Sequence, residues 1–267
     1  MKRKHIFEIE DQAWFPPALR SYMTDVLMEL NRKIGATRAI HHEIQSLIET
    51  YNFSTIVDLG SGSGGPMPEI IEEIRKRTQV ELLLTDLYPN PKSVEAYEHL
   101  DGVVYRKTPM CASAPQIPNK EGCLMTMINS FHHMKPDMAQ EILRSASKNQ
   151  TPLFIYELAD NKIPFLIWLL FLPLGLIINV FSCLILTLFV RPVHPLQLLF
   201  TYIIPIVPIC FAWDGQVSYT RIYTFDDIDI LLRGNESPNY KWTKGYAKDE
   251  NGRSIGTFVL GLPVKSQ

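Results

Sequence analysis

The chain has 267 residues, 46% of them hydrophobic and 20% charged, and its formal net charge is −2. This length and polarity are enough for one large α/β domain or two small ones. Lysine and arginine are spread along the chain, which excludes the basic face of a nucleic-acid-binding protein, so we expect no nucleic-acid partner.

The cysteines and the first residues indicate the cellular setting. Cys111, Cys123, Cys183 and Cys210 form neither a C-x-x-C pair nor a zinc-binding spacing. We therefore expect a reduced, cytosolic environment and no metal. The N-terminal stretch "MKRKHIFEIEDQAWF" is basic at its start but lacks the apolar core of a secretory signal.

The hydrophobic pattern predicts alternating strands and helices. Two helices come first, over 16–34 and 39–51, with apolar residues at helical spacing. There follow strands over 54–60, 80–87, 102–110, 122–131 and 152–159, and helices over 66–78, 91–100 and 135–149. Later, helix 224–234 precedes two strands, 240–248 and 253–263, whose "DENG" connection favours a hairpin. We therefore predict an α/β fold: a Rossmann-like sheet of about seven strands, mostly parallel, with an antiparallel C-terminal hairpin.

A glycine-rich loop, "DLGSGSGGP", follows the first predicted strand. Gly60, Gly62 and Gly64 alternate with serine, and Asp58 lies two residues before the first of them. Glycine allows the positive φ of a tight turn and lets a ligand approach the backbone closely. In an open parallel sheet, ligands bind at the carboxyl ends of the strands. The loop therefore predicts a cofactor site.

The spacing Asp58-x-Gly60-x-Gly62-x-Gly64 resembles motif I of the class I S-adenosylmethionine-dependent methyltransferases. In that family the carboxylate lies near the methionine end of the cofactor, where it balances an ammonium group and would repel a pyrophosphate. Two helices before the first strand and a terminal hairpin are also similar to that family. The loop equally satisfies the dinucleotide fingerprint G-x-G-x-x-G, which here ends at Gly65, so a nicotinamide cofactor stays an alternative.

The resemblance implies S-adenosylmethionine as cofactor and a set of residues that hold it. Asp86 would accept the ribose hydroxyls, residues 110–113 would contact adenine, and residues 129–134 would border the reacting methyl group. The cofactor set is Asp58, Gly60, Ser61, Gly62, Gly64, Asp86, Leu87, Cys111, Ala112, Asn129, Ser130 and Phe131. His132 is a candidate catalytic base, with a pocket-wall histidine as the alternative, and Tyr219 is a second catalytic candidate.

An apolar block follows the fifth predicted strand. Residues 163–190 and, after Arg191, residues 192–212 contain no Lys, Arg, Asp or Glu. A helix rises about 1.5 Å per residue, so about 20 residues cross about 30 Å of hydrocarbon. Both flanks belong to one predicted sheet, which requires an even number of membrane crossings or none. A spanning helical hairpin and an in-plane insert both meet this condition, and the prolines of the second stretch favour the insert. A buried core element of a soluble protein is the alternative.

Polar side chains follow the apolar block in "AWDGQVSYTRIYT". Asp214, Arg221 and Tyr223, with Trp14 from the N-terminal segment, are candidate residues for binding the substrate. The alternative is a capping loop in which Asp214 and Gly215 form a plain turn.

These observations predict three parts and one activity. The parts are an N-terminal helical lid over 1–34, a Rossmann-like methyltransferase domain over 35–162 and 213–267, and a membrane-associating insert over 163–212. The activity is S-adenosylmethionine-dependent methyl transfer at a membrane surface, with the catalytic domain in the cytoplasm. The acceptor is lipophilic: a lipid headgroup, a quinone or a long-chain metabolite. The alternatives are a membrane-bound NAD(P)-dependent reductase and a non-catalytic, membrane-anchored binding module.

Overall fold

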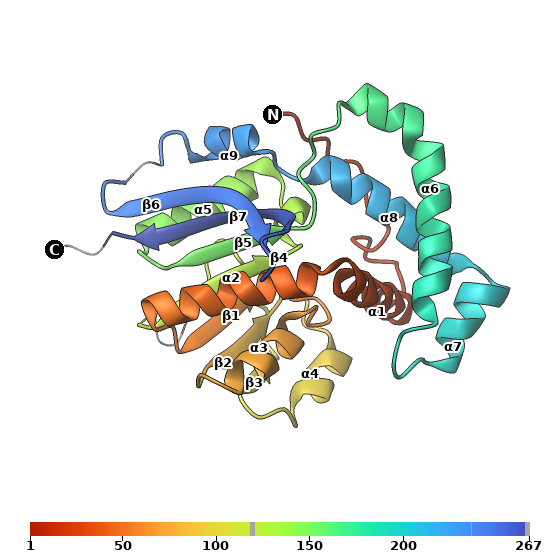
Figure 1. Cartoon of the computed structure of the whole chain (residues 1–267), viewed down its shortest axis with the longest axis horizontal. Helices are drawn as coiled ribbons and strands as arrows, with labels where there is room; N and C mark the ends of the chain where they lie inside the picture. The colour runs from red at the N-terminus through yellow and green to blue at the C-terminus, as the bar shows by residue number, and fades with distance from the viewer. Residues whose placement is uncertain (118–120, 236, 265–267) are drawn as a thin grey trace. The chain divides into compact units, whose positions relative to one another are not determined.

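The structure is a computed structural model of the chain that describes residues 1–117, 121–235 and 237–264. The chain divides into two compact units, which we call the sheet unit and the helical unit (Figure 1). The sheet unit comprises Met1, 35–159 and 225–267, and the helical unit comprises 2–34 and 160–224. The three predicted parts, with their limits at 34, 162 and 212, stay a prediction.

The sheet unit is built on a mixed sheet with seven strands among the described residues, in the order β3-β2-β1-β4-β5-β7-β6. The strands are β1 Thr55–Leu59, β2 Glu81–Thr85, β3 Val103–Tyr105, β4 Cys123–Ile128, β5 Leu153–Glu157, β6 Tyr240–Lys248 and β7 Ser254–Pro263. Strands β1 to β5 run parallel, whereas β7 is antiparallel to both β5 and β6. The predicted α/β sheet with an antiparallel C-terminal hairpin is confirmed.

Helices follow the strands of the sheet unit in alternation. They are α2 Ala36–Tyr51, α3 Met67–Arg75, α4 Pro91–Tyr97, α5 Pro136–Lys148 and α9 Phe225–Leu232. Helix α2 contacts α3, and α5 contacts α9 (Figure 1). Each buries an apolar stripe, as Ile40, Ile44 and Ile48 of α2 illustrate. Helix α3 begins directly after the glycine-rich loop, as the sequence predicts.

Strands β3 and β4 end well before their predicted limits at 110 and 131. Strand β3 stops at Tyr105, which pairs with Leu84, because the neighbouring strand β2 itself ends at Thr85. Strand β4 stops at Ile128, because Asn129 adopts φ +52°. A short 3₁₀ turn, Phe131–His133, follows it. Both early endings lie at the carboxyl edge of the sheet, where the predicted cofactor residues are.

The helical unit contains α1 Pro17–Ile34, α6 Phe165–Thr187, α7 Pro195–Leu198, a π-helical turn η2 Leu199–Ile203 and α8 Ile206–Arg221. One apolar cluster joins its three long helices. Its buried members are Phe15, Leu19, Tyr22, Met23, Val26, Cys183, Leu186, Val207, Cys210 and Phe211. The helical unit therefore has a core of its own.

The alternative of a plain turn at Asp214 and Gly215 is wrong, because both residues lie inside α8. An interior glycine costs roughly 1 kcal/mol of helix propensity, but here its bare backbone admits a neighbour. A Cβ on Gly215 would lie 3.0 Å from Nδ2 of Asn179 on α6. In the same way, a Cβ on Gly175 of α6 would lie 2.5 Å from Oε1 of Gln216 on α8. The two helices therefore approach each other closely at two glycines.

Helix α6 is long and apolar enough to cross a membrane by length and composition. It has 23 residues, and 11% of its most apolar 18-residue window is buried. The segments Pro195–Ile203 and Ile206–Arg221 meet the same criterion only together, as a pair bent by 77°. Among the described residues, the predicted apolar block thus supplies one straight helix of spanning length.

Candidate functional site

The loop between β1 and α3 owes its shape to glycine. Gly60, Gly62 and Gly64 have φ values of +71°, +54° and +104°, in the left-handed region that side chains with a Cβ rarely adopt. A Cβ on Gly64 would clash with the hydroxyl of Tyr97. A Cβ on Gly62 would meet no protein atom within 4 Å. Gly62 is therefore a point at which a ligand could lie directly against the backbone.

Two tyrosines hold the loop in place. The hydroxyl of Tyr105 donates to the carbonyl of Gly62 at 2.6 Å, and that of Tyr97 donates to the carbonyl of Ser63 at 3.0 Å. Their rings are stacked, with centroids 6.3 Å apart. Burial, with the nearby charge of Asp86, raises the pKa of Tyr105, so its hydroxyl stays protonated and remains a donor. The sequence analysis missed both residues.

Asp58 lies at the end of β1 and is almost completely buried, with 3% of its surface exposed. Its carboxylate accepts hydrogen bonds from the hydroxyls of Ser61 and Thr126, each at 2.7 Å. The pKa of Asp58 is raised to about 7, mainly by burial and to a smaller extent by the charge of Asp86, against the lowering effect of these two hydrogen bonds. A cation placed beside this carboxylate would favour its charged form.

Asp86 follows β2 and is tied to the glycine-rich loop. Its Oδ2 accepts the amide hydrogen of Gly62 at 2.9 Å, and its Oδ1 accepts that of Tyr88 at 2.8 Å. An ionised carboxylate has about four acceptor sites, so each oxygen can accept another hydrogen bond. Leu87, beside it, is 46% exposed. This arrangement suits a ligand with two neighbouring hydroxyl groups.

The segment after β3 returns to the end of β2. The amide of Met110 donates to the carbonyl of Asp86 at 2.9 Å, which brings Cys111 and Ala112 close to that strand end. The Sγ of Cys111 lies 3.2 Å from the Oγ of Ser113, and this hydrogen bond lowers the pKa of the thiol.

The turn after β4 is locked between its neighbours. The amide of Asn129 donates to Tyr156 of β5 at 2.8 Å, and its side-chain oxygen accepts the amide hydrogen of Leu158 at 2.9 Å. On the other side, the Ser130 hydroxyl donates to the carbonyl of Leu59 at 3.2 Å. Phe131 is 1% exposed and anchors the turn in the core. The structure thus brings the residues predicted after β1 and β4 together.

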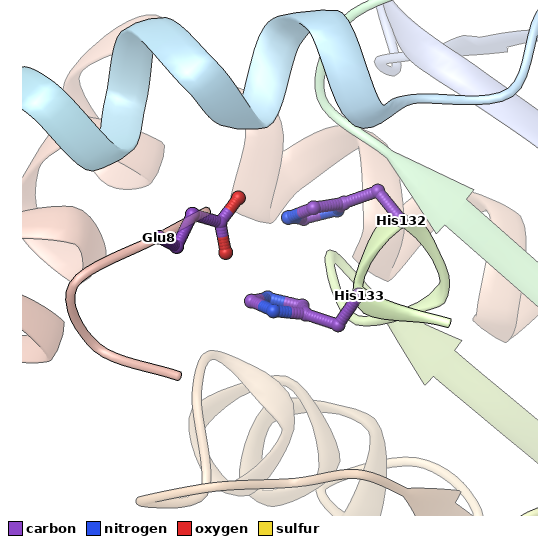
Figure 2. Close-up of side chains that lie close together, drawn as sticks. All are labelled: Glu8, His132 and His133. Carbon is purple, nitrogen blue, oxygen red and sulfur yellow. The ribbon is translucent and has the colours of Figure 1, made fainter. Parts of the chain in front are cut away.

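His132 is paired with a carboxylate that the sequence analysis missed. Its Nδ1 lies 2.7 Å from Oε2 of Glu157, and its amide donates to Oε1 of the same residue at 2.9 Å. Both side chains are buried. Figure 2 shows the imidazoles of His132 and His133 projecting from the turn after β4, with ring centroids 4.3 Å apart. Glu8, also labelled there, belongs to the helical unit. Glu157 fixes the orientation of the His132 ring, as a base in catalysis requires.

The other predicted residues lie in the helical unit, where several bind the chain's own N-terminal segment. The carboxylate of Asp214 accepts the amide hydrogens of Ile9 and Glu10 at 2.7 and 3.0 Å. The hydroxyl of Tyr219 accepts the amide hydrogen of Ile163 at 2.7 Å. Trp14 is 71% exposed.

The guanidinium of Arg221 is also engaged within the helical unit. Its Nη1 lies 2.6 Å from Oε2 of Glu8 and 2.7 Å from Oδ2 of Asp11. The ring of Tyr223 lies 4.3 Å from the guanidinium carbon of Arg3. The predicted roles of the residues in this unit in substrate binding or catalysis stay a prediction.

No family model and no curated protein matches the sequence. Solved methyltransferase structures resemble the fold. An O-methyltransferase family protein from Burkholderia thailandensis is 13% identical with a TM-score of 0.48, over 91% of this chain and 59% of that one. The methyltransferase domain of bacterial CtHen1 is 8% identical with a TM-score of 0.48, over 84% and 98%.

A further similar structure is LepI in complex with SAM, which is 12% identical with a TM-score of 0.44. The match covers 79% of this chain but 43% of the LepI chain, so this chain spans less than half of that protein's length. At these identities the similarity is one of fold, and function resides in the site that the fold carries.

Proposed function

We propose that this protein binds S-adenosylmethionine at the glycine-rich loop and transfers its methyl group to an acceptor. The observation that carries the proposal is a buried carboxylate, Asp58, behind a loop of bare backbone. Asp58 has hydroxyl partners and a pKa of about 7, so it suits an ammonium group rather than a phosphate. Gly62 offers positive φ and no side chain where a ligand would lie.

In this proposal, different residues of the sheet unit bind different parts of the cofactor. Asp58 would hold the ammonium of the amino-acid end, and Asp86 would accept the two ribose hydroxyls. The segment of Cys111 and Ala112 would border the adenine. When bound, S-adenosylmethionine supplies a methyl group on a positively charged sulfur, which needs little activation. The protein would then contribute mainly the orientation of the acceptor and the exclusion of water.

A base is needed only for an acceptor that keeps its proton at neutral pH. For a hydroxyl acceptor, the oxygen would form its bond to the methyl carbon as the carbon–sulfur bond breaks and S-adenosylhomocysteine leaves, and the hydroxyl proton would pass to His132. Because Nδ1 of His132 is paired with Glu157, the proton would be taken at Nε2. Glu157 stabilises the imidazolium that results. A nitrogen acceptor with an available lone pair would need no such step.

The membrane surface is the second part of the proposal. Helix α6 exposes large apolar side chains along its length, among them Leu166, Leu170, Ile177 and Phe181. Exposed apolar surface of this extent marks an interaction site for a partner or a membrane. We therefore propose a membrane-associated enzyme with its sheet unit in the cytoplasm and a lipophilic acceptor: a lipid headgroup, a quinone or a long-chain metabolite.

Equilibrium binding tests the cofactor. Titration calorimetry with S-adenosylhomocysteine should give a measurable Kd for the full chain, and Asp58→Asn should weaken binding at least tenfold because the ammonium loses its countercharge. NADPH should not bind. Binding of NADPH without binding of S-adenosylhomocysteine would instead support the membrane-bound reductase, and binding of neither would leave the non-catalytic module.

Methyl transfer is tested with labelled cofactor on a total lipid extract, followed by identification of the labelled product. Once the acceptor is known, His132→Gln should lower the rate for a hydroxyl acceptor by about 10²- to 10⁴-fold. Glu157→Gln should lower it less and alter the pH profile, since Glu157 acts through His132. A rate unchanged in His132→Gln would exclude the base.

A further inference from the structure

Helix α6 has its polarity inverted relative to a helix of a soluble domain. Its inward side, which packs on the rest of the helical unit, carries the small and polar residues. These are Gly175, Asn179, Ser182, Cys183 and Thr187, and they lie among apolar residues that are also buried or half-buried: Trp168, Leu172, Leu176, Val180, Leu184 and Leu186. Its outward side is uniformly large and apolar, with Leu166, Leu170, Phe171, Leu174, Ile177, Ile178, Phe181 and Ile185 between 52% and 77% exposed. Such a helix is built for an apolar surrounding along its outward side.

The elements packed on the inward side of α6 are not apolar. Helix α8 crosses α6 at Gly175 and Gly215. From Asp214 onwards, the polar side of α8 binds the N-terminal segment 2–15, which has no helix or strand. That segment carries Glu8, whose buried carboxylate pairs with Arg221. Charged groups and irregular backbone thus lie along the half of α6 that begins at Phe165.

This packing decides how α6 can meet a bilayer. A crossing of about 30 Å uses about 20 residues, which is nearly the whole of this 23-residue helix. The N-terminal segment and the polar part of α8 would then lie at hydrocarbon depth. Irregular backbone occurs at that depth only where it is buried in protein or lines a water-filled cavity, whereas residues of this segment such as Lys4 and Asp11 are exposed. The 77° bend between η2 and α8 likewise removes a straight return span.

We infer that α6 lies in the plane of the membrane, with its outward stripe in one leaflet and its inward side toward the headgroups and water. This inference rests on the membrane association proposed above and concerns its geometry. A helix that lies in the membrane plane buries its apolar face about 5–10 Å into the boundary between headgroups and acyl chains. The stripe from Leu166 to Ile185 therefore sits at one shallow depth, and α6 does not cross.

Three substitutions along the stripe test the geometry without altering the inward packing. Leu170, Ile178 and Ile185 are 74%, 53% and 57% exposed, and the outer two are about 22 Å apart along the helix axis. Each is changed to Asp, and co-sedimentation with phosphatidylcholine–phosphatidylglycerol vesicles gives the partition coefficient. Met138→Asp, on the exposed side of α5 in the sheet unit, is the matched control.

The in-plane arrangement predicts similar losses for all three variants, about fivefold to tenfold each, and none for the control. A crossing predicts about 100-fold for Ile178→Asp at the bilayer centre and little at the outer two positions, because the cost of a charge depends on depth. That graded result would overturn the in-plane geometry and leave membrane association standing. Wild-type protein that does not bind vesicles would overturn both, whereas binding of S-adenosylhomocysteine judges the cofactor separately.

Spin labels provide a second measurement of the same geometry. A single cysteine at Leu170, Ile177 or Ile185, in a chain whose native cysteines are replaced by alanine, carries the label. Oxygen and nickel accessibility then report its depth. Equal depths at the three sites support the in-plane helix, and a maximum at Ile177 refutes it. An unchanged circular dichroism spectrum and a cooperative urea unfolding transition show that each labelled chain is folded.

Discussion

Helices α5 and α6 are opposites, although each packs against the rest of its own unit. In α5, Ile142 and Leu143 are buried while Glu141 and Arg144 are about half exposed. In α6, Thr187 is completely buried while Leu170 is 74% exposed. The sheet unit therefore follows the rule for a helix between a protein core and water, and the helical unit breaks it along one side.

The exposed side chains of α5 and α6 indicate what surrounds each helix: water around α5, and an apolar environment along the outward side of α6. Burial of apolar surface contributes about 25 cal/mol per Å², so an exposed Leu170 or Ile177 forgoes this contribution in water. The two units also differ in what their buried hydroxyl groups bind. In the sheet unit Thr126 donates to the carboxylate of Asp58, whereas in α6 Thr187 donates to a helix carbonyl.

The largest effect should come from Gly62→Val in the glycine-rich loop. The new side chain would be strained at φ +54° and would occupy the space in front of the backbone, where no protein atom lies within 4 Å. We expect the affinity for S-adenosylhomocysteine to fall by about 100-fold or more, and stability to fall by about 1–2 kcal/mol from the backbone strain. Titration calorimetry and urea unfolding measure the two quantities.

Gly252→Val is the control that separates the effect of backbone strain from the effect of a side chain that blocks the ligand. Gly252 has φ +77° and lies in the turn between β6 and β7, and a Cβ at this position would also meet no protein atom within 4 Å. The variant should lose similar stability but keep its affinity. If both variants lose binding, strain is the cause, and if neither does, the cofactor lies elsewhere.

Next in size is the buried ion pair of the helical unit. Arg221 and Glu8 are 1% and 0% exposed, with their charged atoms 2.6 Å apart. Arg221→Met leaves a buried carboxylate without its partner, so we expect the helical unit to lose about 3 kcal/mol of stability. Urea unfolding followed by tryptophan fluorescence measures it.

The control for this prediction is Arg144→Met in the sheet unit. Arg144 and Glu141 are about half exposed and 3.4 Å apart, so their separation should cost at most about 1 kcal/mol. Equal losses in the two variants would mean that the Arg221 pair behaves as a surface pair, and that the N-terminal segment is not held by it.

The fold could be predicted from the sequence because its signals are local. Alternating apolar segments and the glycine-rich loop predict the parallel sheet, and "DENG" predicts the hairpin. The sequence did not predict that helix α8 continues past Gly215, because glycine is typical of turns. The reason for a glycine inside this helix, its close contact with Asn179 of α6, is visible only in the structure. The early end of β3 depends likewise on its place at the edge of the sheet, where it pairs only with β2 and cannot continue beyond it.

The candidate site was predicted in its local part and missed in its non-local part. Asp58 and the glycines form a contiguous motif, whereas Glu157 reaches His132 only because β4 and β5 are neighbours. The register pairs Ile128 with Tyr156, so the next residues meet at the strand ends. A signal did exist, because Glu157 is an acidic residue at the carboxyl end of a predicted strand.

A third prediction concerns pH. Burial raises the pKa of Asp58 from 3.8 to about 7. At a pH between these two values, Asp58 is therefore protonated in the folded chain and ionised in the unfolded chain. The stability owed to Asp58 is therefore greatest at low pH and is lost as the pH rises toward 7. Cofactor binding runs in the opposite direction, because an ammonium requires the ionised carboxylate.

We therefore expect the affinity for S-adenosylhomocysteine to rise by about tenfold per pH unit below 7 and to level off above it. Calorimetry between pH 5.5 and 8.5 measures the profile. In Asp58→Asn the rise should disappear, and a wild-type profile that is flat below 7 would contradict the assigned ammonium partner.

The smallest effects distinguish the two buried threonines. Both Thr126 and Thr187 are completely buried, and valine matches the shape of threonine in each. Thr126→Val removes a donor from a buried carboxylate, which should cost about 2 kcal/mol at neutral pH. The same change should raise the pKa of Asp58 and move the binding profile to higher pH.

Thr187→Val removes a hydroxyl whose acceptor, the carbonyl of Cys183, lies inside helix α6. A helix carbonyl keeps its backbone partner, so this substitution should cost less than about 0.5 kcal/mol. Urea unfolding of both variants at pH 7 measures the contrast. Equal losses in the free energy of unfolding would mean that the Thr187 hydroxyl stabilises α6 as strongly as the Thr126 hydroxyl stabilises the carboxylate of Asp58. The polar residues on the inward side of α6 would then stabilise the helix through hydrogen bonds rather than through close packing alone.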